Sequence, residues 1–231
     1  MTFISNNMNA QKLVEFFIHS CSHDLRSPLA SIKGLVQIAE GCHNQEETRN
    51  CLGMITDCAD RMNQLIKTFE EYMETNQHVV AYEEANCRQL TSNIISLFKK
   101  EIEENNLLVE NEVEVGDKWS ADIFTFKLLL KHLISNAITF YDVQKKHRSI
   151  KVSVRSKKGN TFLEVNDNGI GISERVQQKI FDPFYRASTQ ATGFGMGLFL
   201  VNNLVHKTGA RLGLESIVHS GSRFLVVLPN K

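Results

Sequence analysis

In the second half of the region 9–75, apolar and polar residues alternate with a helical period. The apolar positions are Leu52, Ile55, Ala59, Met62, Ile66, Phe69 and Met73, at alternating spacings of three and four. Such spacing keeps all of these side chains on one face of a helix. Three sustained heptads are typical of a coiled-coil or bundle seam rather than of a lone surface helix. The pattern therefore predicts a long helix that packs against other helices.

A second apolar stripe precedes this one. Its members are Ile18, Leu25, Leu29, Ile32, Val36 and Ala39. We expect Gly41 to end this first helix and Asn44 to belong to the turn that follows. Pro28 lies inside the helix and is expected to kink it, because proline lacks a backbone donor. Two antiparallel helices cannot cover both stripes, so we expect two hairpins to pair as a homodimer into a four-helix bundle.

The heptads stop at residues 76–82, which we take as the boundary between a helical domain (1–77) and a second domain (78–231). Beyond the boundary, short alternating segments predict strands at 79–83, 107–115, 149–156, 161–166, 211–216 and 223–228. Helices are expected at 87–104, 121–141 and 199–207, and a tight turn at Lys158-Gly159-Asn160. This order predicts an α+β sandwich with one mixed sheet and helices on one face.

Composition narrows the possible partners and compartment. Lys and Arg number 26, as do Asp and Glu, so net charge favours neither nucleic acid nor an anionic membrane as partner. No apolar run approaches the roughly 20 residues that span a bilayer, and residues 1–10 do not resemble a signal peptide. The five cysteines form no C-x-x-C pair, which favours reduced packing thiols. We expect a cytoplasmic chain, or the cytoplasmic portion of a longer protein.

One histidine stands out on the first helix, in the stretch 22–29. His23 is followed directly by Asp24, and a neutral imidazole can attack through one ring nitrogen while a carboxylate orients the other. His23 lies two residues before Leu25 and is therefore rotated off the apolar stripe, so we expect it to face solvent. Taken alone, these residues fit an ordinary surface histidine better than a nucleophile.

Two later segments could hold a nucleotide. Asn136 lies within an apolar helical pattern and could offer an oxygen to Mg²⁺ and to phosphates, although a solvent-facing asparagine would look the same. Asp167 comes straight after a predicted strand and precedes Gly169 and Gly171. Its carboxylate could accept from the exocyclic amine of adenine, and the glycines would let the backbone approach a flat ligand. Many ordinary turns share this Asp-x-Gly-x-Gly pattern.

A third segment is rich in glycine. Gly193, Gly195 and Gly197 alternate before Leu198 and a helical run, which would leave backbone N–H groups free to bind phosphates at a helix N-terminus. The pattern fits neither the P-loop nor the Rossmann fingerprint. Upstream, the stretch 181–186 contains aromatic residues that could anchor a lid, Phe184 among them, and Arg186, which could reach a phosphate.

In this order and at these spacings, the segments resemble the sensor histidine kinases of two-component systems over residues 11–228. Residues 22–29 resemble the phosphoacceptor box, 132–140 the N-box, 167–172 the G1 box, 181–186 the F-box and 193–198 the G2 box. The resemblance implies a dimerisation and phosphotransfer domain followed by a Bergerat-type (GHKL) ATP-binding domain.

The resemblance also implies an activity, that of a protein histidine kinase using ATP and Mg²⁺. Asp167 would contact adenine, Asn136 would bind Mg²⁺, and residues 185–195 would form a lid. His23 would take the γ-phosphoryl group with Asp24 as base, and would then pass it to an aspartate of a response-regulator receiver domain.

The sequence departs from the family pattern at several positions. Ser27 stands where kinases with phosphatase activity usually carry Thr or Asn, which leaves phosphatase activity open. In the N-box, His132 replaces the usual first Asn and Thr139 replaces a common Lys, while the lid has only six residues (187–192). We expect weaker nucleotide affinity or faster exchange as a result.

Two other functions compete with the kinase. One is a non-catalytic dimeric scaffold that docks a regulator, against which the presence of His23, Asp24, Asn136 and Asp167 argues. The other is a different Bergerat-fold ATPase, such as a chaperone or mismatch-repair protein, and these lack a phosphoacceptor box on a heptad hairpin. The handedness of the turn at 41–45 decides whether transfer occurs within or between subunits, and the sequence leaves both open.

Overall fold

The structure is a computed structural model of the 231-residue chain; it describes residues 2–3, 10–42, 44–116, 119–187 and 193–230, with side chains from Leu25 onward. The chain forms two compact units. One is the helical unit, Asn6–Gln77, and the other, which we call the catalytic unit, contains His78–Lys231 and the first residues of the chain. Each is described by itself.

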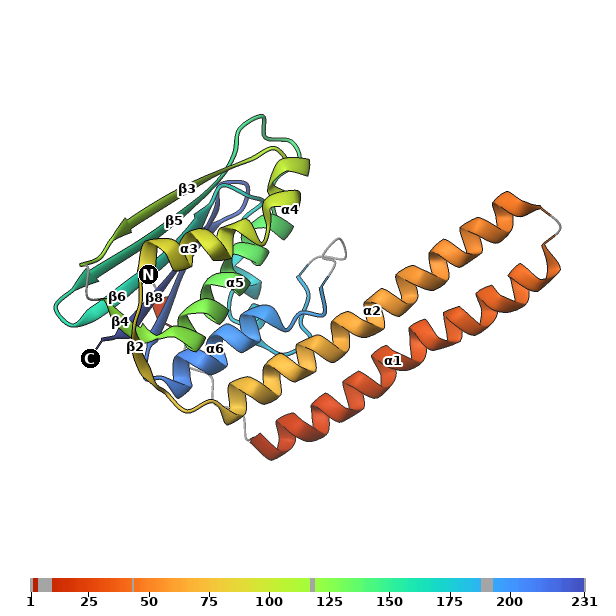
Figure 1. Cartoon of the computed structure of the whole chain (residues 1–231), viewed down its shortest axis with the longest axis horizontal. Coiled ribbons are helices and arrows are strands. Elements are labelled where there is room, and N and C mark those ends of the chain that lie inside the picture. The colour runs from red at the N-terminus through yellow and green to blue at the C-terminus, as the bar shows by residue number, and fades with distance from the viewer. Residues whose placement is uncertain (1, 4–9, 43, 117–118, 188–192, 231) are drawn as a thin grey trace. The chain divides into compact units, whose positions relative to one another are not determined.

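The helical unit is an antiparallel hairpin of α1 (Ala10–Gly41) and α2 (Gln45–Gln77) (Figure 1). Both helices and the turn between them are confirmed within a few residues. Asn44 begins α2 by accepting the backbone N–H of Glu46 on its side-chain oxygen at 2.9 Å. Pro28 lies inside α1 as expected.

The apolar stripes of the hairpin are only partly covered in the single chain. Large apolar side chains that stay exposed along it are Leu29, Val36, Ile38, Leu52, Met54, Ile66, Phe69 and Met73. Neither stripe can therefore be buried by the partner helix of the same hairpin alone. In the part of the chain that the structure describes, no helix combines the length and the apolar character needed to cross a bilayer.

The catalytic unit is built on a six-stranded sheet with the order β1-β7-β8-β6-β5-β3. The strands are β1 (Thr2–Phe3), β3 (Leu107–Glu114), β5 (Arg148–Lys157), β6 (Asn160–Asp167), β7 (Arg211–Ile217) and β8 (Gly221–Pro229). Only β3 and β5 run parallel; the other neighbours are antiparallel. The mixed sheet is confirmed, but strand β1 was not predicted.

Three helices lie on one face of this sheet: α3 (Cys87–Ser96), α5 (Ile123–Thr139) and α6 (Gly197–Lys207) (Figure 1). Leu129, Leu133 and Ile134 of α5 are fully buried in the core with strand residues such as Val152 and Val226. Helix α5 is thus fixed on its apolar face, which leaves its polar face to line a site.

The exposed edge strand β3 carries alternating glutamates. The Oε1 of Glu112 lies 2.5 Å from the Nζ of Lys151, and the Oε2 of Glu114 lies 3.3 Å from the Nε of Arg155. Both Lys151 and Arg155 belong to β5. Glu110 lies 3.8 Å from Lys151. The edge of the sheet is therefore charged and paired with its neighbouring strand.

Two local predictions were wrong, and two short helices were not predicted. The helix expected at 87–104 is split into α3 and α4 (Lys99–Glu104), because the N–H groups of Leu97 and Phe98 bond to carbonyls only three residues back, as in a 3₁₀ turn. The strand expected at 79–83 is β2 (Tyr82–Glu84), which pairs with β4 (Ser120–Asp122) in a separate two-stranded sheet. Two short 3₁₀ helices, η1 (Glu174–Val176) and η2 (Lys179–Phe181), were not foreseen.

The hairpin turn between β5 and β6 is as predicted. Lys158 and Gly159 have φ of 52° and 72°, and the strands pair from Lys157 to Asn160. Two successive residues with positive φ are typical of a type I′ turn, which matches the twist of the flanking strands.

Candidate functional site

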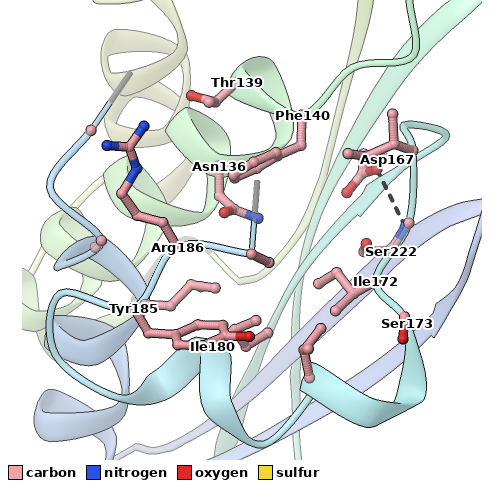
Figure 2. A pocket seen from close by; sticks show the side chains of 18 of the residues that line it. Asn136, Thr139, Phe140, Asp167, Ile172, Ser173, Ile180, Tyr185, Arg186 and Ser222 are labelled. Carbon is pink, nitrogen blue, oxygen red and sulfur yellow. Dashed lines mark hydrogen bonds between the residues drawn. The ribbon is translucent and has the colours of Figure 1, made fainter. Parts of the chain in front are cut away.

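A cavity of about 530 Å³ lies between α5, the end of β6, the η1–η2 segment, the start of α6 and the β7–β8 turn. Figure 2 shows Asn136, Asp167, Tyr185, Arg186 and Ser222 around it. This volume falls within the range of small-molecule sites. The cavity is therefore the candidate functional site of the catalytic unit.

Helix α5 contributes one polar face to the cavity. His132, Ser135, Asn136 and Thr139 all line it, at the spacing of three and four that places residues on one side of a helix. The helix is fixed at its start by Asp122, whose Oδ1 accepts the N–H of Thr125 at 2.9 Å. Burial of the opposite face in the core orients these four side chains toward the cavity.

Asp167 ends β6 and is anchored by backbone donors. Its Oδ1 accepts the N–H of Gly169 at 2.8 Å and that of Ser222 at 3.3 Å, the latter drawn in Figure 2. Burial raises the pKa of this carboxyl from 3.8 to about 6, while the two N–H groups and the charge of Lys145 act in the opposite direction. Above pH 6 the group is a fixed carboxylate that can accept a hydrogen bond from a ligand.

Two glycines let the backbone close tightly around the site. Gly171 has φ of 69°, and a Cβ there would lie 2.0 Å from the carbonyl oxygen of Ile217. Gly195 has φ of 70°, and its Cβ would lie 2.4 Å from the carbonyl oxygen of Tyr185. Any other residue at these positions would be strained and would also clash with backbone atoms.

The far end of the cavity from Asp167 suits an anion. Gly197 and Leu198 open α6 and line the cavity, so the positive end of that helix faces it. Arg186 lines the same end (Figure 2). A ligand with a hydrogen-bond donor at one end and phosphates at the other would match this arrangement.

The β7–β8 turn contributes residues that the sequence analysis missed. Ser222 donates its N–H to Asp167, and Val218 and His219 line the cavity. The Ser216 hydroxyl accepts the N–H of Ile172 at 2.7 Å and contacts the Ser222 hydroxyl at 2.9 Å. The pair Gly221-Ser222, which lies between the two strands predicted at 211–216 and 223–228, was the sequence feature that could have indicated a turn near the site.

Most of the residues proposed to bind the nucleotide come together at the cavity. Those that line it are Asn136, Asp167, Gly171, Arg186, Gly193, Gly195, Gly197 and Leu198. Gly169 shapes the turn behind Asp167 without lining the cavity. Phe184 is not among the lining residues either; it has φ of 61°, and the next residue, Tyr185, lines the cavity instead. The lid expected at 185–195 includes 188–192, which lie outside the described residues.

The stretch 22–29, which resembles a phosphoacceptor box, lies in α1. His23 and Asp24 belong to this helix, but their side chains lie outside the described ones, so a solvent-facing His23 stays a prediction. Ser27, one turn further along, is exposed.

The donor set fits a metal ion that arrives with a ligand. Among the described residues, no group of three His, Cys, Asp or Glu side chains could hold a metal ion by itself. Mg²⁺ commonly uses one or two protein oxygens and completes its shell with phosphates and water. The side-chain oxygen of Asn136, which lines the same cavity as the N-terminus of α6, matches that requirement.

Comparison with known families gives two matches. The model described as "His Kinase A (phospho-acceptor) domain" matches residues 14–76. The model described as "Histidine kinase-, DNA gyrase B-, and HSP90-like ATPase" matches residues 121–231. The first match covers the hairpin that carries His23, and the second covers every residue that lines the cavity.

Individual relatives agree with these matches. The signal transduction histidine-protein kinase ArlS of Staphylococcus aureus is 28% identical over 244 residues, which cover 98% of this chain and 51% of ArlS. The solved histidine kinase AdeS of Acinetobacter baumannii superposes with a TM-score of 0.68 at 20% identity, covering 90% of this chain and 97% of that one. Histidine kinase ThkA, solved in complex with response regulator protein TrrA, gives 0.73 at 20% identity, with coverages of 96% and 63%.

The chain spans between about a quarter and about half of the length of the curated relatives that it matches.

Proposed function

The chain belongs to the sensor histidine kinases, and on that premise we propose that it transfers the γ-phosphoryl group of ATP to His23 and then to an aspartate of a response-regulator receiver domain. One observation carries this proposal. The cavity joins Asp167 and Asn136 to the N-terminus of α6, in a chain whose α1 also holds His23 and Asp24.

The arrangement of the cavity suggests how ATP would bind. Asp167, ionised above pH 6, would accept from the exocyclic amine of adenine. The N-terminus of α6 and Arg186 would receive the phosphates. Asn136 would hold Mg²⁺, which when bound would neutralise charge on the phosphate oxygens.

In the proposed transfer, a ring nitrogen of His23 forms a bond to the γ-phosphorus while the bond from that phosphorus to the β–γ bridging oxygen breaks. ADP is the leaving group, and Asp24 accepts the ring proton. Phosphoryl transfer depends mainly on positioning and on stabilising charge, so the task of the chain is to align the two groups.

The proposed partners are a second copy of the chain and a receiver domain. The exposed apolar side chains of α1 and α2 would be covered when two hairpins pair into a four-helix bundle. The complex of ThkA with its regulator shows that a protein of this fold binds a response regulator. In this role the chain would work in the cytoplasm, where ATP is available.

Radiolabelled ATP tests the proposal. We expect wild type to acquire a label that is stable to alkali and labile to acid, as expected for phosphohistidine, and the label to be absent from His23→Gln and Asp167→Asn. The matched control is His147→Gln, which removes an exposed histidine of the catalytic unit and should leave labelling unchanged.

Other results would point to the competing functions. Nucleotide binding without label or turnover would indicate a scaffold that docks a regulator. Release of inorganic phosphate without protein label, unchanged in His23→Gln, would indicate an ATPase of another type.

A further inference from the structure

The loop between α5 and β5, residues 140–147, is fastened to the turn that follows Asp167. The Nζ of Lys145 donates to the carbonyl oxygens of Asn168, at 2.5 Å, and Gly169, at 3.4 Å. The Asn168 side chain bonds back, since its Nδ2 donates to the carbonyl of His147 at 2.8 Å and its Oδ1 accepts the N–H of Ser149 at 2.9 Å. The loop and the turn therefore hold each other from both sides.

The backbone of the loop around Lys145 is itself held by hydrogen bonds. The guanidinium of Arg148 donates to the carbonyls of Lys145, Asn105 and Val143 at 2.9–3.1 Å. It also lies over the ring of Tyr141, 4.8 Å from its centroid. Lys145 thus reaches the turn from a backbone that is held in place.

The turn has no room to move toward α5. A Cβ on Gly169 would lie 2.2 Å from the carbonyl oxygen of Phe140, and the N–H of Ile170 donates to that same oxygen at 3.0 Å. With α5 on one side and Lys145 on the other, the N–H of Gly169 is aimed at the Asp167 carboxylate.

We propose that Lys145 is a positioning residue for nucleotide recognition: it fixes the Asn168–Gly169 turn and places a positive charge beside the Asp167 carboxylate that contacts adenine. This inference rests on the proposed function and names a residue outside the segments that resemble the family boxes.

Electrostatics give the positioning a measurable consequence. Burial raises the pKa of Asp167 to about 6, and the charge of Lys145 lowers it. A carboxyl group accepts from an amine with both oxygens only when it is ionised. Lys145 thereby extends the range of pH in which Asp167 can act. The other titratable or charged side chains that line the cavity are His132, Tyr185, Arg186 and His219.

The first experiment follows the carboxyl carbon of Asp167 by ¹³C NMR in the nucleotide-free chain. Lys145→Gln keeps a hydrogen-bond donor and loses the charge, Lys145→Arg keeps the charge, and Lys146→Gln removes the same charge from the adjacent exposed lysine. We expect a midpoint near pH 6 in wild type, a higher midpoint in Lys145→Gln, and midpoints close to wild type in Lys145→Arg and Lys146→Gln. Equal midpoints in wild type and Lys145→Gln overturn the proposal.

The second experiment measures binding of Mg²⁺–ADP at pH 6.5 and pH 8 by calorimetry. If the midpoint rises by about one pH unit, the ionised fraction of Asp167 at pH 6.5, and with it the affinity of Lys145→Gln, falls about threefold. The loss should be much smaller at pH 8 and absent in Lys145→Arg. A loss that is equal at both pH values would mean a purely structural role and would contradict the proposal.

The two experiments separate the possible failures. If wild type does not bind Mg²⁺–ADP even at pH 8, the nucleotide role of Lys145 is lost together with the proposed function. If wild type binds Mg²⁺–ADP but the midpoint of the Asp167 titration is the same in wild type and Lys145→Gln, the proposed function stands and the inference about Lys145 is wrong.

Discussion

The carboxylate of Asp167 is 9% exposed, and its pKa in the folded chain, about 6, lies above the value of 3.8 expected when unfolded. Holding the charged form inside the fold therefore costs free energy at neutral pH. Because the folded pKa is the higher one, stability from this group is fully present below pH 3.8 and is lost as the pH rises through 6. The proposed contact with adenine needs the charged form of Asp167, which is the form that lowers the stability of the fold.

Asp167→Asn should raise the stability of the fold and abolish nucleotide binding. The amide oxygen can still accept from the N–H groups of Gly169 and Ser222, and no charge is buried. At pH 8 we expect the free energy of unfolding to rise by up to about 3 kcal/mol, from about 1.4 kcal/mol per pH unit of pKa difference. Urea denaturation at pH 8 measures the gain, which should shrink toward pH 4 while nucleotide binding is lost at both. Equal stability of the two chains at pH 8 would contradict this.

Substitution of two glycines, Gly171 and Gly209, can distinguish the cost of backbone strain from the cost of a steric clash. Gly171 and Gly209 have nearly the same φ, 69° and 68°, but a Cβ at Gly209 meets nothing within 4 Å, whereas one at Gly171 would lie 2.0 Å from the carbonyl of Ile217. We expect Gly209→Ala to cost about 1 kcal/mol, from the left-handed backbone alone. Gly171→Ala should cost clearly more and weaken nucleotide binding. Thermal unfolding of both variants is the measurement, and similar losses would argue against the clash.

Among single residues, the sequence predicted those site residues that lie in contiguous, recognisable segments. Asn136, Asp167 and the alternating glycines could be proposed because their neighbours in sequence define them. Lys145 and Ser222 could not, since their roles arise only when a loop after α5 and a turn after β7 fold back onto the end of β6. No local pattern marks such a long-range contact.

Among the elements, α5 has its start tied to the chain that follows α2. Asp122 caps α5 through the N–H of Thr125, and its Oδ2 lies 2.6 Å from the Nε2 of His78 and accepts the N–H of Ala81 at 3.2 Å. The His78 ring stacks on Phe124, with centroids 4.3 Å apart. One buried carboxylate thus joins the first residues after α2 to the helix that carries Asn136.

Substitutions in this cluster should destabilise the catalytic unit to different degrees. Asp122→Ala removes the cap and leaves buried donors unsatisfied, so we expect a loss of about 2–4 kcal/mol. His78→Phe keeps the stacking and removes one hydrogen bond, for about 1 kcal/mol. Urea denaturation of the whole chain measures both, with the exposed His147→Phe as control. A larger loss in His78→Phe than in Asp122→Ala would refute this ranking.

Helices and strands with a strong hydrophobic periodicity were predicted well. Those whose bounds depend on one or two hydrogen bonds were not. The two long helices and the β5–β6 hairpin follow from heptads and a tight turn. The break between α3 and α4 involves neither glycine nor proline; it depends on two 3₁₀-type bonds at Leu97 and Phe98. β1 is two residues long and is defined only by its pairing with Leu214 and Gly213.

In the whole molecule, the exposed apolar stripes of the hairpin are the surface that the proposed second copy would cover. Ile66 is 47% exposed on the heptad face of α2, so we expect Ile66→Glu to convert a dimer to a monomer by placing a charge in the seam. Sedimentation analysis should show this, with nucleotide binding retained. Val79→Glu changes a side chain that is 80% exposed outside the hairpin and should leave the dimer intact. A dimeric Ile66→Glu would argue against the bundle.

The glutamates of β3 bear on how the protein behaves in concentrated solution. A strand at the edge of a sheet offers unpaired backbone groups to any other molecule, and charged side chains there keep such strands apart. The bond from Lys151 lowers the pKa of Glu112, which keeps one of these charges in place after ordinary carboxylates have been neutralised. Acidification should therefore leave the charge of Glu112 on this edge until the pH falls below the ordinary range of a glutamate, and we expect aggregation through the edge to set in only below that point.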